Sequence, residues 1–397
     1  MTAVDPGGTA PPPTVDGWLA ILERRAGLRA TAGLRRELRP RAAGDGVLDL
    51  AGNDYLGLAR HPEVLDAATG ALHEYGLGAT GSRLVRGSTR AHEALESELA
   101  QWLGASTALV YSSGYLANLG AVKALANPRT LLVSDAHNHA SLVDGCRLAG
   151  AGRDSVQTVV TPHADVAAVR DTLAAYPGRP LVVLTESVFS VDGDLAPLSE
   201  LHAACREYGA LLLVDDAHAL GVIGPQGAGG VAAAGLAGEP DVVLTATLSK
   251  AFGAAGGIVA GPAQLGAHLV DTGRTFIYDT GLPPAVAAGA AAALRLIRAG
   301  DALRVELAER AALAAQRLRA AGLDVLTPAG GVLSVTAPGP QAAVAWAAAC
   351  LSRGVVVGCF RPPSTPDSRS RLRLTVNVGV PRADFEAAID VIVVTAP

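Results

Sequence analysis

The feature that most constrains the fold is an alternation of short apolar runs with amphipathic segments between about residues 62 and 290. The runs have the length of buried strands, and segments such as 91–103 and 198–208 have the spacing of helices. Strands that alternate with helices form a mostly parallel sheet with helices on both faces. The predicted class is therefore α/β. The six runs are ALVYSS (108–113), TLLVSD (130–135), LVVLTES (181–187), LLLVDD (211–216), DVVLTATLS (241–249) and GGIVAG (256–261).

Polar residues follow several of these runs, at the point where each predicted strand ends. Ligands of such sheets bind at the carboxyl ends of the strands, so these residues mark the expected ligand edge. A buried strand such as LLLVDD, which ends in two carboxylates, needs a partner for those charges. The residues are Ser112, Ser113, Gly114, Asp135, Glu186, Asp215, Asp216, Ser249 and Lys250.

The chain is expected to divide into four parts. Residues 1–16 are rich in Pro and Gly and lack the pattern of a signal peptide, which predicts a disordered leader. Residues 17–61 are expected to form a basic helical segment that packs beside the C-terminal domain. The large α/β domain is expected over 62–294. In 295–397, helical segments give way to the runs GVLSVTA, GVVVGCF and RLRLTV, which predicts a smaller α+β domain.

Composition excludes several classes of partner. The net charge of −5 over 397 residues offers no attraction for nucleic acid or an anionic membrane. The longest uncharged apolar stretch, 251–270, holds several glycines and a proline, which argues against a membrane helix. The four cysteines lack the spacing of metal ligands and indicate a reducing compartment. We therefore expect a cytoplasmic protein with no bound metal, nucleic acid or membrane.

Lysine is rare in this chain, because only Lys123 and Lys250 among the 32 basic residues are lysines. Lys250 lies in TLSKAFGAAGG (247–257), just after a predicted buried strand and before a turn rich in small residues. A lysine that is partly removed from water has a lowered pKa and can form a Schiff base with a carbonyl. The alternative is a solvated lysine at the end of a strand.

Three other signals suit the same edge of the sheet. Asp215 could keep a pyridine nitrogen protonated. The segment 112–116, SSGYL, combines a Ser/Gly turn with a helix N-terminus, which can bind phosphate. His139, in DAHNHAS, could stack on a flat ring. Each signal has a purely structural alternative: a capping aspartate, a plain Ser N-cap and a core histidine. Together with Lys250, the three describe pyridoxal 5'-phosphate as the cofactor.

Longer motifs resemble those of the α-oxoamine synthases, which are fold-type I pyridoxal-phosphate enzymes. The resemblance covers nearly the whole chain after the leader and implies a fold like that of aspartate aminotransferase, with sites at a homodimer interface. The motifs are NDYLGLARHP (53–62), GATGSRLVRGSTRAHEALE (78–96), SSGYLANLGAV (112–122), HASLVDG (139–145), TESVFSVDGDLAPL (185–198), VDDAHALGVIG (214–224), TLSKAFG (247–253), FRPPS (360–364) and RLRLT (371–375).

The resemblance implies a role for each matching residue. Lys250 would hold the cofactor as a Schiff base and act as the base at the Cα of the amino acid. Asp215 would pair with the pyridine nitrogen, His218 would contact the ring hydroxyl and His139 would stack on the ring. Thr280 would reach the phosphate bound by the neighbouring subunit. The remaining residues expected to bind the cofactor are Glu186, Ser190, Thr247 and the backbone at Gly114 and Tyr115.

On the substrate side, the resemblance implies that Arg373 binds the carboxylate of the amino acid. Arg35, Asn53 and Ser364 match other substrate positions, although Arg35 could instead be a solvated member of a run of four arginines. Two departures from the family pattern are Ala219, where many members have glycine, and the loop STPDSRS (364–370).

The activity implied is condensation of an amino acid with an acyl-CoA, which releases CoA and CO2 and gives an aminoketone. The motifs are most similar to those of members that join L-alanine to a pimeloyl thioester in biotin biosynthesis. Alternatives within the family use glycine with acetyl- or succinyl-CoA, or serine with a long-chain acyl-CoA. An aminotransferase is a further alternative. A catalytically dead or cofactor-sensing protein is disfavoured, because Lys250 is present and no helix-turn-helix pattern precedes it.

Overall fold

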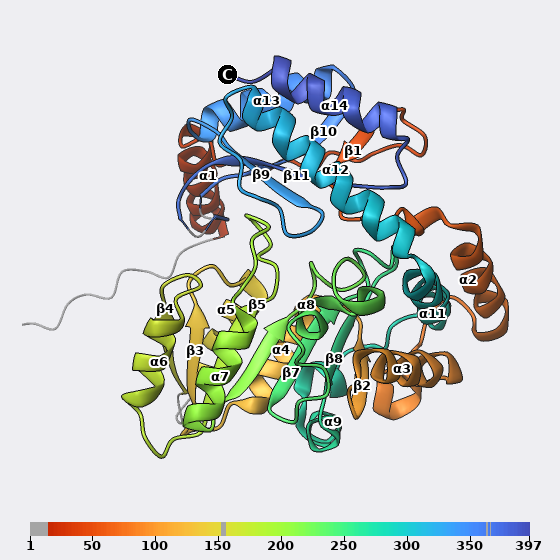
Figure 1. Ribbon diagram of the computed structural model, residues 1–397, viewed down its shortest axis with the longest axis vertical. Coiled ribbons are helices and arrows are strands. Elements are labelled where there is room, and N and C mark those ends of the chain that lie inside the picture. Colours follow the sequence, from red (N-terminus) through yellow and green to blue (C-terminus); the bar gives the residue numbers. More distant parts are fainter. Residues whose placement is uncertain (1–14, 152–155, 363, 366) are drawn as a thin grey trace, which may run out of the picture.

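The computed structural model describes residues 15–151, 156–362, 364–365 and 367–397. The predicted leader lies outside the described residues, apart from Val15 and Asp16, which begin helix α1 (Val15–Thr31). Figure 1 shows a lower part built around a large sheet and an upper part built around a small one. In the described chain, no helix is both long and apolar enough to span a membrane.

The described strands of the lower part form one seven-stranded sheet. Strand β8 runs antiparallel to both of its neighbours and the other pairings are parallel, so the predicted mostly parallel sheet is confirmed. In spatial order the strands are β2 (Thr107–Tyr111), β8 (Gly257–Gly261), β7 (Val242–Thr247), β6 (Leu211–Asp215), β5 (Leu181–Glu186), β3 (Leu131–Asp135) and β4 (Gln157–Thr161). The sequence patterns indicated all but β4, which lies at the edge and has no continuous buried run.

In the strands of this sheet other than the edge strand β4, alternate residues enter two separate cores, one on each face of the sheet. In β5, Leu181 and Val183 join the first core, whereas Val182 and Leu184 join the second. The first core is covered by α3 (Arg90–Leu103), α6 (Val166–Ala174), α7 (Leu198–Tyr208) and α11 (Pro284–Ala299), with α2 (Pro62–Tyr75) outside α11. The second is covered by α4 (Gly114–Leu125), α5 (Ala140–Gly150), α9 (Ala263–Thr272) and α10 (Arg274–Ile277). Helices therefore cover both faces, as predicted.

The upper part combines both ends of the chain. Its sheet has the order β1 (Leu48–Leu50), β10 (Val355–Phe360), β11 (Arg371–Thr375) and β9 (Val332–Thr336). Strand β1 pairs in parallel with β10, so the N-terminal segment contributes an edge strand to the C-terminal sheet. Helices α12 (Asp301–Ala320), α13 (Pro340–Ser352) and α14 (Arg382–Val394) pack against this sheet (Figure 1). The predicted division at 294–295 falls inside α11 and, like the other predicted boundaries, stays a prediction.

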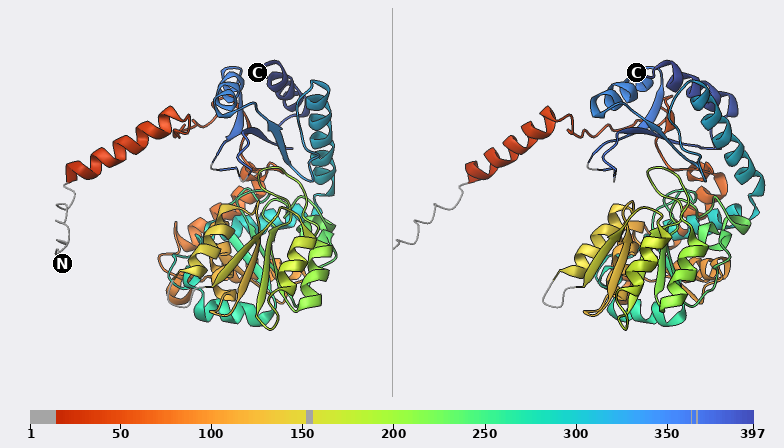
Figure 2. Two further views of the ribbon diagram at one scale, coloured as in Figure 1. Left: turned by 90° about the vertical axis from the view of Figure 1, so that its left-hand side faces the viewer. Right: turned by 60° about the vertical axis from the view of Figure 1, so that its left-hand side comes forward.

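Helix α1 is separate from both parts. None of its residues is buried, and Figure 2 shows it extending away from the body of the protein. Its apolar side chains Trp18, Leu19 and Leu22 are exposed. A helix forms here as predicted, although in the single chain its apolar side chains are not buried against either part. The rest of the segment 17–61 does pack beside the C-terminal domain, because Arg361 donates to the carbonyl of Gly33, Arg36 donates to Ser364 and β1 joins the C-terminal sheet.

Candidate active site

Lys250 lies in a tight turn that follows β7. The turn closes with backbone hydrogen bonds from Leu248 to Gly256 (3.0 Å) and from Gly253 to Lys250 (2.8 Å). Gly253 has a φ of 62°, and a Cβ on it would lie 2.2 Å from the backbone nitrogen of Ala59. Only glycine fits there, because the turn is pressed against the short helix η1 (Leu58–Arg60). The N-terminal segment thus helps to fix the position of Lys250.

The surroundings of Lys250 favour its neutral amine. Burial lowers the pKa of Lys250 to about 8, although the carboxylate of Asp215 raises it. The positive charge of Arg373 also lowers this pKa, whereas Glu186 raises it. No hydrogen bond from the Lys250 amine to another described residue is found. A neutral, unpaired amine at this position can attack a carbonyl carbon.

Asp215 ends strand β6 and is held by two donors. Its Oδ1 accepts a hydrogen bond from the backbone of Ala217 (3.0 Å), and its Oδ2 accepts one from the amide of Asn118 (2.7 Å). Asn118 is itself held, because its Oδ1 accepts from Thr245 (2.5 Å). Asn118 was not among the residues predicted from the sequence. The available signal was a polar residue on the buried face of α4, beside Ala117 and Ala121.

His139 and Asp215 are joined through the same amide. His139 caps the N-terminus of α5, where its Nδ1 lies 2.7 Å from the hydroxyl of Ser141. Ser141 in turn accepts a hydrogen bond from Asn118 (2.8 Å). Burial lowers the pKa of His139, and the charges of Lys250 and Arg373 act in the same direction. A neutral imidazole next to Asp215 suits stacking on a flat, electron-poor ring.

His218 belongs to a second buried cluster, with Tyr55, Asn53 and Arg373. Its Nδ1 lies 2.6 Å from the hydroxyl of Tyr55 and 3.4 Å from Nη2 of Arg373. The same Nη2 donates to Oδ1 of Asn53 (3.0 Å). The cluster joins the carboxyl end of β6 to strand β11, so the site lies where the two sheets meet. The family resemblance implied roles for Asn53, His218 and Arg373, but none for Tyr55.

Glu186 ends strand β5 beside this cluster. Burial raises the pKa of Glu186 well above its usual value, and the charge of Asp215 raises it further. Its Oε2 accepts a hydrogen bond from the backbone of Ser190 (3.0 Å). Its Oε1 is buried and has no hydrogen-bond partner in the described chain. A protonated carboxyl group can donate a hydrogen bond from that position.

The N-terminus of α4 lies next to the end of β7. A Cβ on Gly114 would lie 2.9 Å from Cβ of Thr247, so glycine lets the two backbones approach. The first N–H groups of a helix have no partner within the helix, and those of Gly114 and Tyr115 are therefore suited to a phosphate. The Tyr115 hydroxyl donates to Asp144 (2.7 Å). The Thr247 hydroxyl donates to the Gly256 carbonyl (2.9 Å) and so supports the lysine turn.

Three predicted residues lie away from this cluster. Arg35 is exposed and lies 3.6 Å from Glu37, whereas its neighbour Arg36 donates to the hydroxyl of Ser364 (2.7 Å). Ser364 is exposed as well. Thr280 is exposed and pairs with Ser82 in an isolated bridge. In the single chain, therefore, none of the three meets the lysine.

The residues that the structure brings together fit the predicted cofactor. Pyridoxal 5'-phosphate requires an amine, an acceptor for its pyridine nitrogen, a flat neighbour for its ring and donors for its phosphate. Lys250, Asp215, His139 and the start of α4 offer these groups at one edge of the sheet. Two buried polar atoms there, Oε1 of Glu186 and Nε of Arg373, have no hydrogen-bond partner among the described residues. Such atoms are typical of a site that is completed by a ligand.

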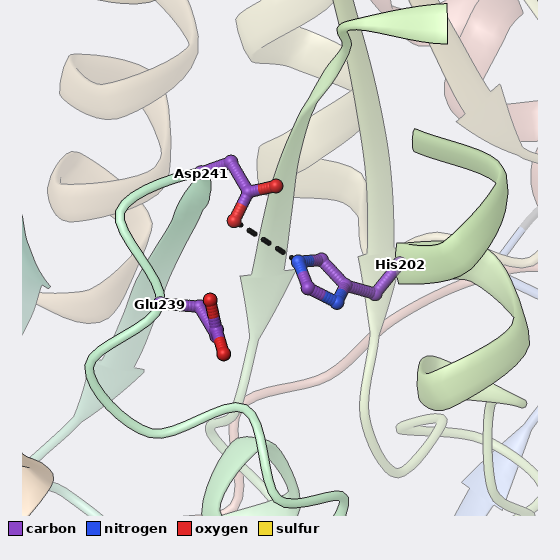
Figure 3. Close-up of side chains that lie close together, drawn as sticks. All are labelled: His202, Glu239 and Asp241. Carbon is purple, nitrogen blue, oxygen red and sulfur yellow. Dashed lines mark hydrogen bonds and ion pairs between the residues drawn. The ribbon is translucent and has the colours of Figure 1, made fainter. Parts of the chain in front are cut away.

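One cluster in the described chain has the composition of a metal site. His202, Glu239 and Asp241 offer ligand atoms within 4.8 Å of one another (Figure 3). Asp241 precedes β7, at the end of that strand opposite to Lys250. Arg206 forms ion pairs with Glu239 and with Asp241 (3.0 Å). Because a guanidinium already neutralises both carboxylates, we interpret the cluster as an ion-pair network. The prediction of no bound metal stays a prediction.

Comparison with known proteins identifies the family. Residues 45–392 match the aminotransferase class I and II family. Over 372 residues, the chain is 54% identical to the 8-amino-7-oxononanoate synthase of Mycolicibacterium smegmatis and 53% identical to that of Mycolicibacterium gilvum, covering 94% of both proteins in each case. The chain belongs to the aminotransferase class I and II family, among the 8-amino-7-oxononanoate synthases. The predictions that it is an enzyme and resembles the α-oxoamine synthases are therefore confirmed.

Solved structures agree with this assignment. Serine palmitoyltransferase of Sphingomonas wittichii superposes with a TM-score of 0.87 at 30% identity, over 95% of this chain and 96% of the other. The 8-amino-7-oxononanoate synthase of Francisella tularensis superposes with a TM-score of 0.75 over 88% of this chain and 97% of the other. At 24% identity, the second similarity bears on the fold alone. The predicted fold-type I fold is confirmed.

Proposed function

We propose that this chain joins L-alanine to a pimeloyl thioester with pyridoxal 5'-phosphate as cofactor, giving 8-amino-7-oxononanoate, the free thiol and CO2. The observation that carries the proposal is the buried Lys250, flanked by Asp215, His218 and Arg373, in a chain 54% identical to an 8-amino-7-oxononanoate synthase. The lowered pKa of Lys250 suits both roles that the reaction requires of this residue. As a neutral amine it holds the cofactor, and once released it accepts the proton from Cα of alanine.

The residues around Lys250 have separate tasks. When bound, the cofactor stabilises the negative charge that develops at Cα of the amino acid. Asp215, oriented by Asn118, would accept a hydrogen bond from the pyridine nitrogen and keep it protonated. His139 would stack on the ring, and His218 would donate to the ring oxygen. The N–H groups at the start of α4 would bind the phosphate.

Arg373 binds the carboxylate of alanine. Its side chain is buried, and one of its donors is taken by Asn53 (3.0 Å). Its Nε has no hydrogen-bond partner in the described chain. A buried guanidinium with a free donor binds a carboxylate strongly, because both charges are removed from water. The carboxylate that Arg373 orients is the one that leaves as CO2.

The proposal includes a homodimer in the cytoplasm. Thr280 is exposed and forms a bridge with Ser82, which precedes the π-helical segment η2 (Arg83–Gly87). Three apolar residues nearby are also exposed: Leu84 and Val85 of η2, and Tyr278. Such a patch suits an interface through which Thr280 reaches the site of a second copy. Leu84→Asp should halve the mass in sedimentation, whereas Leu326→Asp, at an exposed position of the small domain, should not. An unchanged mass would argue against this interface.

The four unpaired cysteines suit a reducing compartment.

A substrate panel tests the proposed activity. Alanine, glycine and serine are each combined with acetyl-, succinyl-, pimeloyl- and palmitoyl-CoA, and free thiol and CO2 are measured. We expect release of both only with alanine and pimeloyl-CoA, and none from Lys250→Ala. A different preferred pair would contradict the proposed substrates. Activity of Lys250→Ala would contradict the proposed lysine.

A second candidate function is condensation of serine with a long-chain acyl-CoA. It is favoured by the TM-score of 0.87 with the serine palmitoyltransferase of Sphingomonas wittichii. Against it, identity to that enzyme is 30%, compared with 54% to the 8-amino-7-oxononanoate synthase. Serine with palmitoyl-CoA in the same panel decides between the two.

A further inference from the structure

Tyr55 has no role in the proposed function, yet its hydroxyl makes the shortest polar contact of His218. The side chain is fully buried, and its hydroxyl oxygen lies 2.6 Å from Nδ1 of His218. The two rings meet edge to face, with centroids 6.3 Å apart and planes at 63°. The residues are 163 positions apart in the sequence, so the contact joins the N-terminal segment to the end of β6.

The direction of this hydrogen bond follows from Arg373. Its Nη2 lies 3.4 Å from the same Nδ1, and a guanidinium can only donate. An Nδ1 that faces a guanidinium must therefore be the unprotonated nitrogen of the ring. Tyr55 must then donate to it. The other acceptor within reach of the hydroxyl, Oδ1 of Asn53, is much farther away, at 3.4 Å compared with 2.6 Å for Nδ1 of His218.

The ring of His218 carries one proton rather than two. Burial lowers its pKa well below the usual value, and the positive charges of Lys250 and Arg373 lower it further. With Nδ1 acting as an acceptor, the single proton lies on Nε2. Among the described residues, none accepts a hydrogen bond from Nε2. This nitrogen is therefore a free donor in the site.

We infer that Tyr55 is a positioning residue, whose hydroxyl fixes His218 as the neutral tautomer with its proton on Nε2. The consequence rests on the proposed function: His218 then approaches the ring oxygen of the cofactor as a donor. In the opposite tautomer, Nε2 of His218 would be unprotonated. It would then face the ring oxygen as a second hydrogen-bond acceptor, and the cofactor ring would be held more weakly. The assignment of the tautomer itself rests only on the contacts of Tyr55, His218 and Arg373.

Hydrogen bonds of the main chain hold Tyr55 in place. The main-chain carbonyl of Tyr55 accepts a hydrogen bond from Val378 (3.0 Å), and the main-chain N–H of Tyr55 donates to the carbonyl of Asn53 (2.9 Å). A Cβ on Gly331 would lie 2.5 Å from Cδ1 of the Tyr55 ring. The ring is thus packed against the small domain on one side, while its hydroxyl faces the histidine of the large domain. It cannot turn away without moving the loop before β9.

The first test is nuclear magnetic resonance of the unmodified protein with isotope-labelled histidine. Couplings between ring nitrogens and ring protons show which nitrogen carries the proton. The chain has nine histidines, and the signal that disappears in His218→Gln identifies the ring. We expect a protonated Nε2 and an unprotonated Nδ1 near neutral pH. A proton on Nδ1 would overturn the inference, and this measurement needs no Tyr55 variant to fold.

The second test compares Tyr55→Phe with Tyr111→Phe. Tyr111 is also a buried tyrosine, but its hydroxyl has no hydrogen-bond partner in the described chain. Tyr55→Phe should shift the His218 signals toward the other tautomer and lower kcat about tenfold, with KM changed less than about twofold. Tyr111→Phe should change neither. Equal behaviour of the two variants would contradict the role of Tyr55.

These tests separate the inference from the proposed function. A protein with the expected tautomer that fails to use alanine with any thioester would contradict the function and leave the assignment of His218 intact. A protein that makes the expected product, but carries the proton of His218 on Nδ1, would contradict the assignment of His218 and leave the proposed function intact.

Discussion

Lys250 should react as a free amine at a pH well below that of an ordinary lysine. Burial and the charge of Arg373 lower its pKa from 10.5 to about 8. At 1.36 kcal/mol for each pH unit, this favours the neutral amine by about 3 kcal/mol. At pH 7.5, about a quarter of the Lys250 side chains would then be neutral, against about one in a thousand for an unperturbed lysine.

Competitive acetylation of the cofactor-free protein measures this difference. The protein is treated briefly with acetic anhydride at a series of pH values, and the peptides that carry each lysine are quantified by mass spectrometry. Because the chain has only two lysines, Lys123 serves as the reference for reagent reactivity. We expect modification of Lys250 to rise with a midpoint near pH 8. A midpoint near 10.5 would refute the argument from burial.

Two variants test the sign of the electrostatic contributions. Arg373→Leu removes a nearby positive charge and should move the Lys250 midpoint to higher pH, because the ammonium form becomes less costly. Asp215→Asn removes a nearby negative charge and should move the midpoint to lower pH. Shifts of both midpoints in the same direction would show that the site rearranges, and would contradict the electrostatic explanation.

Three further predictions concern the supports of the site. Gly253→Ala should displace the lysine turn and reduce bound cofactor, measured by absorbance, because its Cβ would lie 2.2 Å from a backbone nitrogen of η1. Gly235→Ala, with a φ of 75° and no atom within 4 Å, is the control for backbone strain alone. Asn118→Leu removes the 2.7 Å hydrogen bond to Asp215 and should weaken cofactor binding about tenfold in a fluorescence titration; unchanged affinity would contradict its orienting role. Burial raises the pKa of Asp216 in the folded protein from 3.8 to about 6. Between these pH values the folded protein keeps a proton that the unfolded chain loses, so the free energy of unfolding should fall by up to about 3 kcal/mol as the pH rises. Asp216→Asn should remove that slope in urea unfolding, and an unchanged slope would assign it to other groups.

The parts of the site that follow strands were open to prediction from the sequence. The carboxyl ends of β5, β6 and β7 carry Glu186, Asp215 and the turn of Lys250, and parallel pairing brings these ends to one edge. Any chain with this alternation of strands and helices would place them similarly. Their proximity therefore depends on topology, which is visible in the pattern of apolar runs.

Tyr55 and Asn118 could not be found in this way. The contact of Tyr55 with His218 depends on how the N-terminal segment folds back over the large domain, and no local pattern records that. Asn118 lies on the apolar face of α4, where a single amide is only a weak exception to the periodicity. Arg35 and Arg36 are adjacent, and only the path of the chain after α1 decides that Arg36 meets Ser364.

The hydrogen bond between Asn53 and Arg373 joins residues 320 positions apart. During translation, the ribosome therefore releases the lysine and its neighbouring carboxylates long before it releases the arginine. A nascent chain arrested before β11 would hold the amine without the guanidinium that lowers its pKa. The site is assembled only after β11 has been synthesised, so a product truncated before β11 does not hold the complete candidate site.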